Sequence, residues 1–333
     1  MNRENKRIKT DGYTMDNISH AMLKPNKLNK DELETIHTAS LEILEQTGIK
    51  VQSKTARNVF ESGGATVDGE WVRIPSRLTE DSIKTAPSEI LLAGRNKKND
   101  YEIKQNKVAF INFGEGVNVI DPYTREYRMS TKADIGNITL VTDSLDIFPV
   151  AYRSVASQDK NPHVQSLHNT EVMFHNTSKH IFTGPDGAKN ALKIIDMAAA
   201  VVGGKDILKQ RPIITFNVCP TSPLQLTPSA SDVIIVAAKA GVPCNVISMA
   251  LSGATAPVTL AGTLVTHNAE VLAAVVLSQL TCKGAPILYG SSTTIMDFRH
   301  ITTPVGAPEL AMISNAVAQL AGYYLLPSFV AGG

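Results

Sequence analysis

After about residue 131, short runs of consecutive apolar residues alternate with longer segments in which apolar residues recur at helical spacing. Apolar runs without polar alternation, joined by helices, are typical of parallel strands that are covered on their outer face. We therefore predict strands near 146–151, 180–184, 213–217, 244–248, 286–290 and 327–331. The segments between them predict helices at about 164–177, 188–202, 228–240, 258–281 and 307–323.

The repeated strand–helix unit predicts an α/β fold, a (β/α)8 barrel of the TIM type. An open, doubly wound sheet is the alternative, but no Gly-x-Gly-x-x-Gly motif follows an early strand. Only six strands are predicted, whereas a closed barrel needs eight. Because stable proteins avoid an unpaired buried sheet edge, either two strands go unrecognised before residue 131 or the chain is an incomplete gene product. We favour the second explanation and expect a barrel that lacks its last two βα units.

The pattern also divides the chain along its length. The predicted regions are a loose polar N-terminal arm, an α+β cap and the barrel core, at residues 1–28, 29–130 and 131–333. Within the cap, Leu33 to Leu44 show helical spacing, and Gly48 is placed to end that helix. Short strand-like pieces follow at 108–111 and 117–120.

Composition narrows the class of protein. The chain has 333 residues, a formal net charge of +1 and a hydrophobic fraction of 43%. That fraction permits a full core and excludes a disordered chain, while the balanced charge argues against nucleic-acid binding. No apolar run reaches the roughly 18 residues of a transmembrane helix, and the polar start lacks the apolar stretch of a signal peptide. Cys219, Cys244 and Cys282 lie among apolar residues and predict reduced core thiols of a cytoplasmic protein.

In (β/α) barrels the active site lies at the carboxyl ends of the strands. The predicted ends are rich in small, hydroxyl-bearing and glycine residues, which let backbone groups come close to a ligand. Tyr289 and Ser291 belong to one such end, although each end could equally be an ordinary tight turn. In the cap, Glu115 follows Phe113 within a glycine-flanked turn, and a carboxylate beside an aromatic ring can help to hold a cation.

Three polar residues, His267, Asn268 and Glu270, interrupt an otherwise apolar helical segment. Buried polar groups need hydrogen-bond partners or a wet cavity. The long spacing between the flanking strands predicts a short helix after Pro257 and a second helix from about Thr266, and that break would raise the three residues toward the barrel mouth. A hydrogen-bonded polar patch between helix and strand is the competing interpretation, and the residues alone leave both open.

His168, Glu171 and His175 share one face of a predicted helix and carry metal-ligating groups. The two histidines are about 10 Å apart along the helix, which is too far for one ion. A solvated or capping face is the preferred interpretation, so no metal site is predicted.

Four segments together resemble the trimethylamine methyltransferase family: Cys219–Leu224, Leu260–Glu270, Tyr289–Thr294 and Leu326–Gly333. The cap segment Phe113–Gly116 is similar to its counterpart there, except that Glu115 stands where a small hydroxyl residue is expected. The resemblance runs from about Leu33 to the last residue. It implies a (β/α)8 barrel that moves a methyl group from trimethylamine to the cobalt of a corrinoid carried by a separate protein, with no cofactor bound directly.

The resemblance also offers a reason for the missing strands. Archaeal-type members carry pyrrolysine, encoded by an amber codon, at about the position after the final glycine pair, so a chain ending at Gly333 is expected if that codon is read as a stop. Members without pyrrolysine act on quaternary amines such as glycine betaine, and this alternative stays open, as does a truncated, inactive product. We also expect a homo-oligomer.

Either donor is small and cationic, so its pocket should offer aromatic faces and carboxylates. The candidates for substrate binding are Tyr289, Phe113, Glu115 and Ser291, and the candidates for catalysis are His267, Asn268 and Glu270. A barrel aldolase or isomerase acting on a phosphorylated substrate is a different class of enzyme. It predicts a lysine or arginine at a strand end, and none stands at the ends of the strands predicted at 213–217, 244–248, 286–290 and 327–331.

Overall fold

The computed structural model describes residues 28–104 and 107–331. Its centre is a six-stranded sheet, parallel throughout, with the strand order β16-β14-β12-β10-β9-β8. The strands are β8 (Val150–Tyr152), β9 (His180–Thr183), β10 (Ile214–Val218), β12 (Cys244–Ser248), β14 (Ile287–Ser291) and β16 (Ser328–Val330). The six predicted strands are therefore confirmed. β9, β10, β12 and β14 are buried at every position, which explains why they read as unbroken apolar runs.

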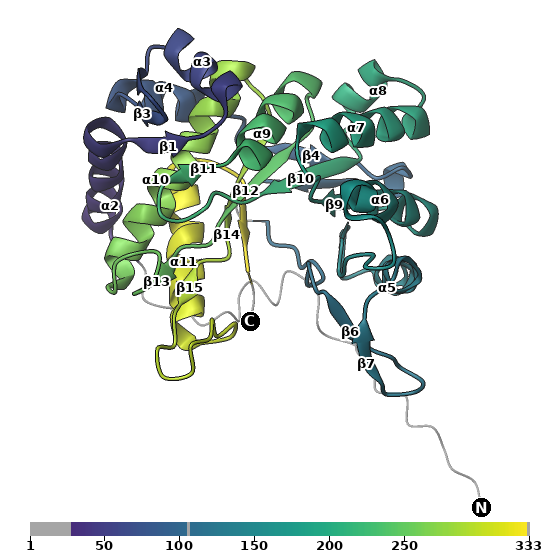
Figure 1. Ribbon diagram of the computed structural model, residues 1–333. Coiled ribbons are helices and arrows are strands. Elements are labelled where there is room, and N and C mark those ends of the chain that lie inside the picture. The colour runs from purple at the N-terminus through teal and green to yellow at the C-terminus, as the bar shows by residue number, and fades with distance from the viewer. Residues whose placement is uncertain (1–27, 105–106, 332–333) are drawn as a thin grey trace, which may run out of the picture.

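Helices follow the strands and pack on the convex side of the sheet (Figure 1). They are α6 (Gln165–Asn176), α7 (Ala188–Val202), α8 (Lys205–Gln210), α9 (Pro228–Ala240), α10 (Leu260–Thr281) and α11 (Pro308–Tyr323). A proline at the first helical position begins α9 and α11, where its missing N–H removes no hydrogen bond. Of these six helices, the short α8 has no counterpart among the predicted ones, and the other five do.

The sheet curves so strongly that side chains from its two edge strands meet. β8 and β16 stand at opposite ends of the strand order, yet the rings of Tyr152 and Phe329 lie 6.3 Å apart, edge to face. Phe182 of β9 lies 6.3 Å from Tyr152 and 6.2 Å from Phe329. Aromatic side chains from three strands thus fill the concave side, as side chains fill the interior of a small barrel. The described strands form a half-barrel.

The segment before the sheet begins with α2 (Lys30–Glu42). Asn29 caps this helix by accepting a hydrogen bond from the N–H of Glu32, whose carboxylate accepts from the N–H of Asn29 in return. A π-helical turn (Ile43–Thr47) ends at Gly48, as predicted, where φ is +83° and a β carbon would lie 2.5 Å from the carbonyl oxygen of Val72. The elements that follow are β1 (Ile49–Val51), α3 (Lys54–Ser62), β2 (Thr66–Asp68), β3 (Trp71–Arg73) and α4 (Ser76–Thr85).

Two hairpins come next in the chain. The first, β4 (Ile90–Leu92) with β5 (Tyr101–Ile103), packs on the concave side, where Ile90 and Leu92 contact the cluster of Val150, Phe182 and Leu288. The second, β6 (Asn118–Ile120) with β7 (Tyr127–Met129), projects at the lower edge of the molecule in Figure 1. The strand predicted at 117–120 is therefore confirmed.

The strand-like piece predicted at 108–111 is not a strand in the structure. α5 (Lys132–Ser144) leads from the second hairpin into β8, and two 3-10 turns, Lys97–Asn99 and Pro162–Val164, lie in connecting loops. The division into a cap at 29–130 and a core at 131–333 stays a prediction. The predicted arm lies outside the described residues, apart from Leu28.

α10 is a single uninterrupted helix of 22 residues, so the predicted break near Thr266 is wrong. The extra length between β12 and β14 is taken up by the loop before Thr259. Oγ1 of Thr259 caps α10 by accepting a hydrogen bond from the N–H of Gly262. By length and hydropathy α10 could cross a membrane, but 78% of its apolar window is buried inside the fold, as expected of a central core helix. Three further strands of two residues each lie between the elements named above: β11 (Gln225–Leu226), β13 (Leu251–Ser252) and β15 (Thr294–Ile295).

Candidate functional site

Two polar residues lie side by side on the concave face of the sheet, one near the carboxyl end of β10 and one near the amino end of β12. Asn217 of β10 lies beside Asn245 of β12, which lies beside Leu288 of β14, so the three side chains share the concave face. Nδ2 of Asn245 donates to Oδ1 of Asn217 over 3.0 Å. Nδ2 of Asn217 and Oδ1 of Asn245 are buried without a partner among the described residues. Unsatisfied amide atoms on a buried face are rare and indicate a place where polar ligand atoms can bind.

A segment that runs beside β8 brings Glu115 to this face. Nδ2 of Asn112 donates to the carbonyl oxygen of Tyr152, whose N–H donates back to Oδ1 of Asn112, both over 2.8 Å. The N–H of Gly116 donates to the carbonyl oxygen of Ser154, also over 2.8 Å. The segment therefore covers the outer edge of β8 and holds Glu115 at the carboxyl end of that strand.

Glu115 forms an ion pair at this end of the half-barrel. Its Oε1 lies 2.7 Å from Nη2 of Arg153, and the two side chains are 46% and 10% exposed respectively. Nε of Arg153 is buried and has no partner in the described part of the chain. A β carbon on Gly184 would lie 3.4 Å from Oε1 of Glu115 and 3.6 Å from the carbonyl oxygen of Asn217. The pair thus adjoins the ends of β9 and β10, where barrel enzymes bind their substrates.

Tyr152 supplies an aromatic ring beside the carboxylate. Burial, and after it the charge of Glu115, raises the pKa of the Tyr152 hydroxyl above its usual range, so the hydroxyl stays protonated. A β carbon on Gly114 would lie 2.2 Å from the Tyr152 ring, so the segment can cross the ring only with glycine there. Phe113 belongs to the same segment but is 71% exposed. The structure brings Glu115 to the site and leaves the Phe113 ring mostly in solvent.

Tyr289 and Ser291 face the helices instead of the concave side. Leu288 and Gly290 of β14 take the concave face, so their neighbours in the strand point the other way. The Tyr289 hydroxyl donates to Oδ1 of Asn268 over 2.7 Å. Ser291 is fully buried, and its Oγ accepts from the N–H of Thr293 over 3.1 Å. The expected place of these two residues at the mouth is corrected, while their part in substrate binding stays a prediction.

His267 and Asn268 are fully buried between α10 and its neighbours. Nδ1 of His267 lies 3.2 Å from Oγ1 of Thr293, and burial lowers the pKa of His267 to about 3, so its ring is neutral near pH 7. Nδ2 of Asn268 donates to the Tyr324 hydroxyl over 2.8 Å and to Oγ of Ser40 over 2.9 Å. These contacts match the competing interpretation of the sequence, a hydrogen-bonded polar patch between helix and strand.

Glu270 is also fully buried on α10. Its carboxylate accepts hydrogen bonds from Oγ of Ser248 over 2.7 Å, and from Oγ of Ser222 and the N–H of Leu224 over 2.9 Å each. Burial raises the pKa of Glu270, and these three hydrogen bonds act against that rise. Because α10 is continuous, no break raises His267, Asn268 or Glu270 to the mouth. Their catalytic roles stay predictions.

His168, Glu171 and His175 lie on one face of α6, where they form a surface network with Lys132. Glu171 pairs with Lys132, and Oε1 of Glu171 lies 3.3 Å from Nε2 of His175. Nζ of Lys132 lies 3.3 Å from Nδ1 of His168. Residues 28–104 and 107–331 contain no group of three or more histidine, cysteine or acidic side chains that could hold a metal ion.

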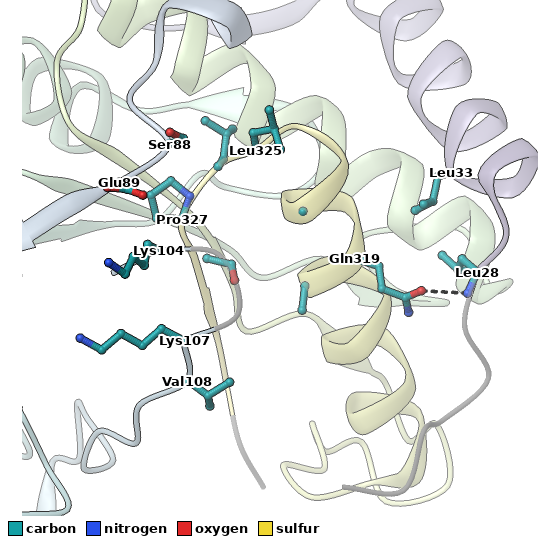
Figure 2. A pocket seen from close by; sticks show the side chains of 14 residues that line it. Leu28, Leu33, Ser88, Glu89, Lys104, Lys107, Val108, Gln319, Leu325 and Pro327 are labelled. Carbon is teal, nitrogen blue, oxygen red and sulfur yellow. Dashed lines mark hydrogen bonds between the residues drawn. The ribbon is translucent and has the colours of Figure 1, made fainter. Parts of the chain in front are cut away.

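A cavity of about 680 Å³ lies beside β16 and α11 (Figure 2). Oε1 of Gln319 on α11 accepts from the N–H of Leu28 over 2.9 Å at its rim. Lys104, Lys107 and Glu89 line this cavity, so its charged side chains are positive on balance and disfavour a cationic amine. The concave face beside Glu115 is therefore the better candidate for an amine site.

The sequence patterns miss Arg153, Asn217 and Asn245. Each is a single polar residue in or directly after an apolar strand, and such a residue stands out only when the strand register is known. One signal was available for Asn217, the last residue of the strand predicted at 213–217. Asn245 is the second residue of the strand predicted at 244–248 and carries no such signal. Strand ends in a predicted barrel are the places where an isolated polar residue indicates binding.

The family model for trimethylamine methyltransferase (MTTB) matches residues 1–333 of this chain. Trimethylamine methyltransferase MttB of Desulfitobacterium hafniense (strain DSM 10664 / DCB-2) is 57% identical, over 91% of this chain and 62% of that protein. MttB of Methanosarcina thermophila is 42% identical, over 92% and 65%. Glycine betaine methyltransferase of D. hafniense (strain Y51) is 31% identical, over 93% and 65%. The chain spans a little less than two thirds of the length of these relatives.

A solved structure, the crystal structure of the Methanosarcina barkeri monomethylamine methyltransferase (MtmB), matches with a TM-score of 0.55 at 14% identity. The match covers 92% of this chain and 68% of that one. At such low identity it concerns the fold alone, and it agrees with the barrel-type sheet. The family match along all 333 residues and the 57% identity concern the sequence itself. On those grounds, this chain belongs to the trimethylamine methyltransferase family.

Proposed function

We propose that the chain binds trimethylamine as a methyl donor and presents it to the cobalt of a corrinoid carried by a separate protein. The observation that carries the proposal is the Glu115 carboxylate, held next to the Tyr152 side chain at the carboxyl end of the half-barrel. Carboxylates and aromatic side chains are the groups that recognise small methylated cations. Membership of the trimethylamine methyltransferase family supports the same donor.

The reaction defines what the site must do. The carbon–nitrogen bond of the protonated donor breaks with its electron pair left on nitrogen, so neutral dimethylamine departs. The carbon–cobalt bond forms with an electron pair from Co(I), which becomes Co(III). Amine departure needs a positive nitrogen, so the site must favour the protonated donor. A negative carboxylate beside the nitrogen raises the pKa of the donor and stabilises that form.

Arg153 has a defined part in this proposal. Nη2 of Arg153 lies 2.7 Å from Glu115, so the arginine neutralises the carboxylate when no donor is bound. Arg153 is largely buried whereas Glu115 is half exposed, so one side of the carboxylate remains open toward the mouth. A donor cation would approach from that open side and share Glu115 with Arg153.

Glycine betaine is the second candidate donor, and one observation favours it. Nε of Arg153 is buried without a partner in the described part of the chain, and guanidinium groups bind carboxylates. The Glu115 carboxylate would repel the carboxylate of glycine betaine at the same place. The greater identity to the two MttB proteins, 57% and 42% against 31%, also favours trimethylamine.

The test measures methyl transfer by the chain to cob(I)alamin and to a Co(I) corrinoid protein, with trimethylamine, glycine betaine or no donor. Methylation is followed by the visible absorbance of the corrinoid. We expect donor-dependent methylation with trimethylamine only. Methylation with glycine betaine alone would reverse the donor assignment. A folded chain that neither methylates cobalt nor binds trimethylamine in a calorimeter would contradict the proposal and would indicate an inactive protein.

The corrinoid protein as partner, the homo-oligomer, the cytoplasmic location and the lack of nucleic-acid or membrane partners stay predictions. The amine site proposed here depends on none of them.

A further inference from the structure

Glu270 is a buried carboxylate that the proposed reaction does not use. Its exposed fraction is 0%, and no salt bridge reaches it among the described residues. A buried charge is unfavourable unless hydrogen bonds compensate it. Glu270 has three such bonds, from Ser248, Ser222 and the backbone of Leu224. These three donors fix the position of the Glu270 carboxylate. The segments that supply the donors indicate what this carboxylate holds together.

Two of the donors belong to the loop that follows β10. In this loop Thr221 and Gln225 exchange two backbone hydrogen bonds of 2.8 and 3.0 Å, which close a tight turn. Leu224 within the turn has a φ of +53°, a left-handed conformation that residues other than glycine adopt only when their surroundings hold them. The N–H of Leu224 donates to Oε1 of Glu270 over 2.9 Å. Glu270 is therefore a contact that holds the turn in this conformation.

The third donor belongs to the neighbouring strand. Ser248 is the last residue of β12, and its Oγ bonds the same Oε2 atom of Glu270 as Oγ of Ser222. One carboxylate on α10 thus joins the turn after β10 to the carboxyl end of β12. The same two strands, β10 and β12, carry Asn217 and Asn245, the amide pair of the candidate site.

The turn is also continuous with the amine site. It begins shortly after Val218, the end of β10. Both the carbonyl oxygen of Asn217 and Oε1 of Glu115 lie within 3.6 Å of the place that a β carbon on Gly184 would take. A shift of the turn would move the end of β10 against Glu115. The position of that strand end decides how closely a bound amine can approach the carboxylate, and small displacements at a site have large effects on rate.

We propose that Glu270 is a positioning residue, whose carboxylate fixes the turn at residues 221–225 against the end of β12 and so sets the wall of the amine site beside Glu115. The tether itself is a property of the fold. Its kinetic consequence rests on the proposed function, because it requires the amine to bind at Glu115.

The tether is tested in the absence of a methylated amine, by hydrogen–deuterium exchange in Glu270→Ala and in a matched control. Gln279→Ala is the control, because Gln279 lies on the same helix and has other partners. Its Nε2 donates to the carbonyl oxygen of Ala285, and its Oε1 accepts from the N–H of Gly284. We expect exchange of the 219–226 peptide to rise about tenfold in Glu270→Ala, the effect of one lost buried hydrogen bond, and to stay unchanged in Gln279→Ala. Equal exchange of this peptide in both variants would overturn the tether.

Glu270→Gln separates charge from hydrogen bonding and serves if the alanine variant does not fold. The amide oxygen can still accept from Leu224, and the amide nitrogen can donate to the serine hydroxyls. We expect exchange between that of the unmodified chain and that of Glu270→Ala, together with a raised KM for trimethylamine and a smaller change in kcat. A raised KM without a change in exchange would contradict positioning and indicate direct contact with the donor. Changed exchange in a chain that transfers no methyl group would keep the tether and reject the proposed function.

Discussion

The Tyr289 hydroxyl donates a hydrogen bond of 2.7 Å to Oδ1 of Asn268, so two residues expected at the barrel mouth bind each other on the helix side of the sheet. Nδ2 of Asn268 continues the network to Ser40 on α2 and to the hydroxyl of Tyr324, directly after α11. A single asparagine thus connects the central sheet to three helical segments. The arrangement gives Asn268 and Tyr289 a structural role that can be measured apart from catalysis.

Replacing Asn268 with alanine removes three buried hydrogen bonds and leaves the Tyr289 hydroxyl without its acceptor. We expect the free energy of unfolding to fall by about 3 kcal/mol, because each buried group left unpaired costs about 1–3 kcal/mol. Urea unfolding followed by circular dichroism measures this change. Asn58, exposed on α3, is the control, and Asn58→Ala should change stability by less than about 0.5 kcal/mol. Equal effects of the two variants would contradict the network.

Tyr289→Phe removes only the hydroxyl and keeps the ring in the core. We expect a loss of about 1–2 kcal/mol in the free energy of unfolding, because Oδ1 of Asn268 loses its donor. The KM for trimethylamine should not change, since Tyr289 faces the helices. A raised KM in a variant of normal stability would return Tyr289 to the substrate site predicted from the sequence.

Two buried histidines make stability depend on pH. Burial lowers the pKa of His180 and of His267 to about 3 each. The unfolded chain therefore binds protons between about pH 3 and 6.5 that the folded chain does not, so the free energy of unfolding falls as pH decreases through this window. Each histidine contributes a slope of up to about 1.4 kcal/mol per pH unit. Glu270, whose pKa is raised, contributes with the opposite sign just above pH 4.5.

Comparison of variants isolates the histidine contribution. His267→Gln should flatten the pH dependence of the urea midpoint between pH 7 and 5 relative to that of the unmodified chain. An unchanged slope in His267→Gln would mean that His267 is not held neutral by burial.

Glu115→Gln tests the amine site directly. The substitution keeps the size of the side chain but removes the negative charge that faces the donor cation and Arg153. We expect the dissociation constant for trimethylammonium, measured by calorimetry, to rise about tenfold, in the range of a partly exposed charge contact. Glu126→Gln, on the exposed turn between β6 and β7, is the matched control and should leave the constant unchanged. Equal affinity in both variants would remove Glu115 from the site.

Gly290 leaves the space that the Asn245 side chain and the backbone of Val246 occupy beside β14. A β carbon at Gly290 would lie 2.5 Å from Oδ1 of Asn245 and 2.5 Å from the carbonyl oxygen of Val246. Gly290→Ala should therefore destabilise the protein by about 2 kcal/mol, as overpacking of a core does. Gly322 lies on α11, where a β carbon would meet open space among the described residues, so Gly322→Ala should instead stabilise by about 0.5–1 kcal/mol through helix propensity. Thermal melting of the two variants in opposite directions would confirm the difference.

The parallel sheet, its six strands and five of the helices that follow them could be predicted from the amino-acid sequence without any coordinates. Strands buried on both faces must be apolar throughout, and that requirement leaves unbroken runs such as those around Phe216 and Val246. The same sequence also contained the motifs that resemble the trimethylamine methyltransferase family, and the family match along the whole chain confirms that membership.

The face of the sheet that each side chain occupies became known only from the three-dimensional arrangement. Side chains alternate between the two faces of a strand. When both faces are apolar, the sequence does not show which residues point to the concave side of the sheet. Sequence patterns thus placed Tyr289 at the mouth, and the register turned it toward Asn268. The site needed the same information, because Glu115 and Arg153 are 38 residues apart in the sequence and meet only when the segment beside β8 is paired. Contacts between distant segments depend on register and curvature, and neither leaves a local pattern in the sequence.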